Sequence, residues 1–76
     1  MSVRTDVDKI RVLLSHWVEH SREHAEEFCE WAERIEGLVS DEVVLHLRSS
    51  GEAMEKVAEH LQAALNHFGG VPEEGH

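Results

Sequence analysis

Residues 7–35 read VDKIRVLLSHWVEHSREHAEEFCEWAERI, and their apolar positions recur in alternating steps of three and four. This spacing places one stripe of side chains along a single face of an α-helix and forms a heptad seam. Thr5 or Asp6 can cap the start and Gly37 can end the helix, so we expect a helix over residues 6–36. The seam positions are Val7, Ile10, Leu14, Trp17, Ser21, His24, Phe28, Trp31 and Ile35.

A second seam follows after a short link. Ser40 suits the N-cap position and Gly69-Gly70 the stop, which predicts a helix over residues 41–68. Gly51 lowers helix propensity by roughly 1 kcal/mol, but the periodicity continues in phase across it, so we expect at most a bend. Residues 71–76 lack periodicity and are predicted to be a flexible tail. The seam positions are Val43, Leu47, Ser50, Met54, Val57, Leu61, Ala64 and Phe68.

The link is short enough to make the two helices antiparallel neighbours. Placing Ile35 opposite Val43 also pairs His24 with Met54, so one register satisfies the whole length. The sequence therefore predicts an all-α fold, with residues 1–76 forming a single domain that is an antiparallel αα-hairpin of two long helices.

One flank of this hairpin carries apolar and mostly small residues, which allow another helix to approach closely. A hairpin has nothing of its own to cover that flank, so we expect a homodimer that forms a four-helix bundle with Trp17 and Trp31 in its core. The flank comprises Val18, Ala25, Ala32, Val44, Gly51, Ala58 and Leu65.

Residues 16–24, HWVEHSREH, contain H-x-x-E-H twice and share the middle histidine. Histidines four residues apart lie on one helix face and can chelate one transition metal. The predicted register brings His60 of the second helix near His20. The candidate metal ligands are His16, His20, His24 and His60, with Glu23 and Glu27 as carboxylate ligands or as acceptors that orient an imidazole.

Neutral imidazoles suit Zn or Ni foremost, with Co and Cu(II) as alternatives. The single Cys29 argues against Fe–S clusters and Cu(I), and it excludes an intrachain disulfide. Each histidine could also have a structural role or be solvated, without binding metal. His24 occupies a seam position, where a hydrogen-bonded core histidine is common, and His16 can be solvated.

Acidic residues outnumber basic ones 16 to 7, and the formal net charge is −9. Nucleic acid and anionic membrane surfaces are poor partners for such a chain. No apolar run is long enough to cross a membrane, and the N-terminus has no signal-peptide pattern. The expected location is therefore the cytoplasm.

Enzymatic readings of the histidine motif lack their structural context. H-x-x-E-H also occurs in inverzincin metalloproteases, but a helical hairpin offers no substrate cleft. Ferritin-like di-iron sites use Glu-x-x-His, whereas His24 and Glu27 stand in the reverse order. We therefore expect a small non-enzymatic transition-metal-binding protein, acting as a carrier, buffer or sensor. The alternative is a dimerisation or adaptor module with a pH-sensitive histidine edge and no physiological metal.

The run HWVEHSREHAEEF at residues 16–28, followed by Trp31-Ala32, resembles a recurrent motif in small uncharacterised prokaryotic proteins. Those proteins are compact, helical and rich in histidine. The resemblance implies a small helical domain and implies no particular activity or metal.

Overall fold

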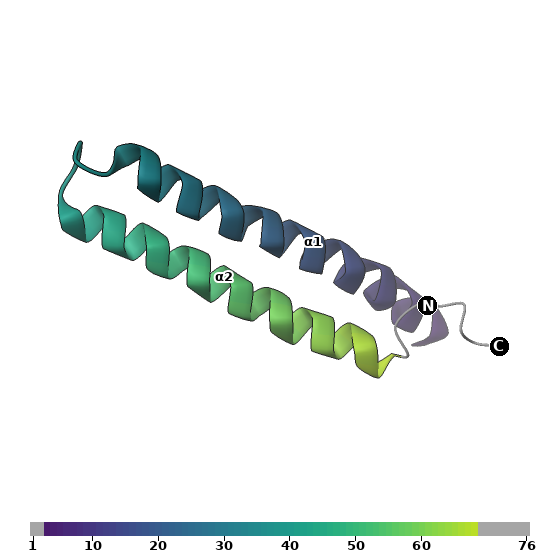
Figure 1. Cartoon of the computed structure of the whole chain (residues 1–76). Helices are drawn as coiled ribbons and strands as arrows, with labels where there is room; N and C mark the ends of the chain where they lie inside the picture. Colours follow the sequence, from purple (N-terminus) through teal and green to yellow (C-terminus); the bar gives the residue numbers. More distant parts are fainter. Residues whose placement is uncertain (1–2, 69–76) are drawn as a thin grey trace.

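The computed structural model describes residues 3–68 as two long helices joined by a short turn. Helix α1 covers Val3–Ile35 and helix α2 covers Asp41–His67. They lie side by side and run in opposite directions (Figure 1). No strand occurs within these residues, so the predicted helical hairpin is confirmed. Neither helix of this part of the chain is long and apolar enough to span a membrane.

The helix bounds differ from the predicted ones mainly at the start of α1. This helix begins at Val3, so Thr5 and Asp6 lie inside its first turns and do not cap it. It ends at Ile35, one residue before the predicted end, and α2 ends at His67. Gly51 lies within α2, which continues unbroken through it. The predicted stop at residues 69–70 and the predicted tail at 71–76 lie outside the described residues.

The turn between the helices uses the predicted capping residues. Gly37 has φ +86°, the left-handed conformation that glycine adopts at low cost, and the N–H of Leu38 donates to the carbonyl of Ile35 at 2.9 Å. Ser40 is the N-cap of α2, and its Oγ accepts from the Val43 N–H at 3.4 Å. These local bonds stop one helix and start the next within five residues, which forces the chain to reverse.

The two helices meet along the small-residue flank. On α1, Ala25 is 3% exposed and Ala32 is 0% exposed, and on α2 Ala58 is 1% exposed. The prediction that a second copy of the chain covers this flank is wrong, because the flank closes the hairpin itself, together with Leu14 and Ser21 of the seam. The buried positions are Leu14, Val18, Ser21, Ala25, Ala32, Val44, Gly51 and Ala58.

Small residues close the hairpin because they let the helix backbones approach. A Cβ atom added at Gly51 would lie 3.2 Å from the Ala25 carbonyl oxygen and 3.6 Å from the Phe28 Cβ. At the open end, the Arg11 guanidinium lies 5.2 Å from the centre of the Phe68 ring. These pairs fall within one or two residues of the predicted register, so the lengthwise alignment agrees with the prediction although the contacting flank does not.

The residue immediately before a buried position is repeatedly a large, exposed apolar side chain. One residue back is a rotation of about 100°, and because the helices are antiparallel this rotation leads to the same side of the hairpin on both. Trp17 is 40% exposed and Trp31 is 50% exposed on this side. We call it the apolar face, and its members are Leu13, Trp17, Trp31, Val43 and Val57.

The residue immediately after a buried position is mostly charged. This pattern places the opposite side of the hairpin in contact with water, and we call it the polar face. Its members include Glu19, Arg22, Glu26, Glu33, Glu52 and Glu59. The hairpin is therefore amphipathic as a whole, with one apolar and one polar face.

Candidate metal centre

Three histidine rings form a continuous row along α1. His16 and His20 are stacked with ring centroids 5.6 Å apart, and His20 and His24 meet edge to face at 4.7 Å. His24 in turn stacks on Phe28 at 5.7 Å. The four-residue spacing predicted this row, because each step of four returns to nearly the same helix face.

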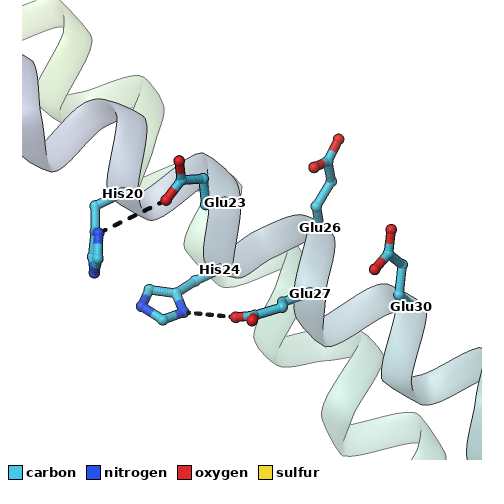
Figure 2. A pocket seen from close by; sticks show the side chains of 6 residues that line it. All are labelled: His20, Glu23, His24, Glu26, Glu27 and Glu30. Carbon is cyan, nitrogen blue, oxygen red and sulfur yellow. Dashed lines mark ion pairs between the residues drawn. The ribbon is translucent and has the colours of Figure 1, made fainter.

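Two of these histidines pair with a carboxylate three residues further on. The Nδ1 atom of His24 lies 3.3 Å from the Oε1 of Glu27, and the Nδ1 of His20 lies 3.9 Å from the Oε1 of Glu23 (Figure 2). The nearer contact is not aligned as a hydrogen bond, and the Nδ1 of His24 is shielded from solvent without a hydrogen-bond partner. Each carboxylate therefore lies beside its ring without a hydrogen bond to it. The role of Glu23 and Glu27 as ligands or as orienting acceptors stays a prediction.

A shallow pocket of about 380 Å³ surrounds this pair of histidines. Figure 2 shows that His20 and His24 project to one side of α1, whereas Glu26 and Glu30 project to the other. Several carboxylates beside two imidazoles make the local potential negative, which favours a cation. The pocket is lined by His20, Glu23, His24, Glu26, Glu27 and Glu30.

His60 is not brought to the histidine row. It lies two residues after buried Ala58, about 200° around α2, and is exposed on the side of that helix away from α1. The predicted approach to His20 depended on both rows of the seam contacting across the hairpin, whereas the structure leaves the row with Trp17 and Trp31 outside the contact. Among residues 3–68, no group of three or more His, Cys, Asp and Glu side chains is arranged to hold a metal ion.

His16 is exposed at the N-terminal end of the row, and no carboxylate contact to it is found within the described residues. The row therefore offers one pair of adjacent imidazoles, His20 and His24, each with an associated carboxylate. Two imidazoles on one helix turn are half of a tetrahedral ligand set.

Sequence reasoning missed the relation of His24 to the apolar face. His24 directly precedes buried Ala25, just as Trp17 precedes Val18 and Trp31 precedes Ala32. The signal was present in the sequence as two parallel stripes with the same seven-residue period. The burial of the stripe with Val18, Ala25 and Ala32 shows that the stripe with Trp17, His24 and Trp31 faces outward.

Comparison with known proteins gives two matches. A family described as "Domain of unknown function (DUF8180)" matches residues 10–68. A protein of Archaeoglobus fulgidus described as "Uncharacterized protein" is 38% identical over 63 residues, which cover 83% of this chain and 100% of the archaeal protein. No solved structure matches the chain. The residues that the family matches include all of α2 and α1 from Ile10 onward.

Proposed function

The chain belongs to the DUF8180 family of domains of unknown function, and from its geometry we propose that it is a non-enzymatic helical module that pairs with a second copy of itself. The observation that carries this proposal is the apolar face. Its large side chains are half exposed, whereas the buried positions of the hairpin are mostly small residues.

The exposed apolar area is large for so small a chain. Trp17 at 40% and Trp31 at 50% exposure leave on the order of 200 Å² of aromatic surface in water. Leu13, Val43 and Val57 extend this surface along both helices. Monomeric proteins rarely expose contiguous apolar patches beyond a few hundred Å². Covering the face would add burial that a two-helix layer lacks.

A second copy is the occupant that fits this face best. The 27 residues of α2 give an overlap about 40 Å long, and two packed helices are about 20 Å across. The face therefore covers on the order of 800 Å² per copy, which is the area that a standard protein interface buries on each partner. Two such faces packed together form a four-helix bundle, with Trp17 and Trp31 of both copies in its core.

Light scattering of the purified chain at micromolar concentration tests this proposal. We expect the mass of two chains, and we expect Trp31→Glu to give the mass of one chain with its helicity retained. Leu45→Glu is the matched control, because Leu45 is 59% exposed but follows buried Val44 on the polar face. A wild-type chain that is monomeric and fully helical contradicts the proposal, as does equal dissociation by both substitutions.

The second candidate function is transition-metal binding, as a carrier, buffer or sensor. The observation in its favour is the pair His20 and His24, whose Nδ1 atoms face Glu23 and Glu27. A carboxylate on one ring nitrogen is typical of histidines that bind metal through the other. Zn and Ni are the first metals to test, followed by Co and Cu(II). Failure to bind either Zn or Ni at defined stoichiometry near neutral pH removes this candidate.

A further inference from the structure

His24 interrupts the apolar face at its middle. Along α1, Trp17, His24 and Trp31 each precede a buried position and are seven residues apart. On α2 the corresponding row is Val43, Ser50 and Val57, so each row has a polar residue at its centre. The two centres lie within about one helical turn of each other, because Gly51, which follows Ser50, lies against the turn from Ala25 to Cys29.

A second copy packed on the apolar face would bury His24. Its side chain is 41% exposed in the hairpin, and packing a second copy on this face would remove that exposure. Buried polar groups need partners, because leaving one unpaired costs free energy. The proposed dimer thus requires a partner for an imidazole at the centre of its interface.

Two-fold symmetry makes the second His24 the nearest candidate for this position. The axis that relates two packed faces lies between them, in the plane of the interface. If the axis runs parallel to the helices, every residue lies at the same height along the bundle as the same residue of the second copy. If the axis runs perpendicular to the helices, only residues at the midpoint of the face lie at the same height as the same residues of the second copy. His24 lies near the midpoint of the face, so either direction brings the two His24 residues to the same level.

We infer that the dimer completes a transition-metal site from His20 and His24 of both copies, and this inference rests on the proposed self-association. The His20 and His24 rings of one chain are 4.7 Å apart. Two such pairs supply four imidazole nitrogens, the number that a tetrahedral zinc site takes. Within one chain the described residues do not provide such a group.

The orientation of the rings suits this role. The Nδ1 of His24 and the Nδ1 of His20 each face the carboxylate three residues on, at 3.3 and 3.9 Å. This leaves the Nε2 atoms as ligands, with Glu27 and Glu23 favouring the tautomer that carries its proton on Nδ1.

The charges of the site also favour a cation. Dimerisation would bring Glu23 and Glu27 of both copies near the axis, and four carboxylates at close range repel one another. A divalent cation between the histidines compensates that charge. The same metal would tie the copies together, since each copy supplies only half of its ligands.

Titration of the full chain with Zn²⁺ by calorimetry, together with light scattering, tests the inference. We expect one Zn²⁺ per two chains, and a dimer dissociation constant at least about tenfold lower with Zn²⁺ than with a chelator. His20→Ala and His24→Ala should each abolish Zn²⁺ binding while circular dichroism shows unchanged helicity. His60→Ala is the matched control and should bind as the wild type does, because His60 lies off the apolar face.

The outcomes separate this inference from the proposed function. A dimer that binds no Zn²⁺ overturns the metal site and leaves the self-association standing. A monomer that binds one Zn²⁺ per chain overturns both. Binding that survives in His20→Ala or in His24→Ala, or that is lost in His60→Ala, overturns the assignment of the ligands.

Discussion

Replacing Gly51 by leucine tests the close packing that closes the hairpin. A Cβ at this position would lie 2.8 Å from the Cys29 Sγ and 3.2 Å from the Ala25 carbonyl oxygen. The Cys29 side chain is exposed and can turn away. The Ala25 oxygen belongs to the backbone of α1 and moves only with that helix. The further carbons of leucine therefore have to separate the helices.

Two opposing effects set the size of the change. Leucine is a better helix former than glycine by roughly 0.8 kcal/mol, which stabilises α2. Overpacking a close interface costs about 1–3 kcal/mol, and leucine adds four carbons where even one is crowded, so we take the upper end. The net expectation is a loss of about 2 kcal/mol in the free energy of unfolding, or about 10 °C in Tm for a domain of this size.

Urea denaturation followed by far-UV circular dichroism measures this loss. The variants are compared at equal protein concentration and with a chelator, because dimerisation and metal binding both shift apparent stability. Ala53→Leu is the matched control, since Ala53 is exposed on the same helix and should change stability little. If Gly51→Leu is as stable as the wild type, the helices are not in close contact at this point and the assignment of the buried flank is wrong.

A smaller substitution at the same position measures the sulfur contact separately. Gly51→Ala adds only the Cβ, so its crowding against the Cys29 Sγ should be relieved when Cys29 is also replaced by alanine. We expect the pair of substitutions to be more favourable than the sum of the single effects by about 0.5–1 kcal/mol. Additive effects would mean that the sulfur is not the obstructing atom.

Four further predictions concern the caps, the apolar face and the metal. Ser40→Ala removes the Oγ that accepts from the first turn of α2 and should cost about 1 kcal/mol in urea denaturation. Gly37→Ala places a Cβ at φ +86° and should cost about 1–2 kcal/mol by the same assay, and no loss would mean that the turn rearranges freely. Trp17→Glu should convert the dimer to a monomer in sedimentation experiments, whereas a dimer that survives it places the interface elsewhere. Removing metal with a chelator should lower the Tm of the wild type but not that of His24→Ala. An equal decrease in both would mean that His24 does not bind the metal.

The sequence located most of the candidate site and misplaced one part of it. The row from His16 to His24 and the association of His24 with Glu27 follow from spacing on a single helix, and the structure has both. The contact between His20 and His60 needed the relative rotation of two helices. The contact keeps Leu14 and Ser21 of the predicted seam but replaces Trp17 and Trp31 by the residues that follow them, so the rotation differs by part of the roughly 100° that one residue turns. His60 consequently faces away from the row.

The sequence by itself determined the two helices, the turn and the lengthwise register. These depend on effects within a few residues, such as the left-handed Gly37 and the Ser40 cap, and on a spacing that continues over the whole chain. Tertiary structure alone decided which of two adjacent stripes closes the hairpin. Both stripes repeat every seven residues, so periodicity cannot separate them. The size of the side chains distinguishes the two stripes. Ala25 and Gly51 let the helix backbones approach, whereas tryptophans in the contact would keep the helices apart, so the large side chains lie on the outer face.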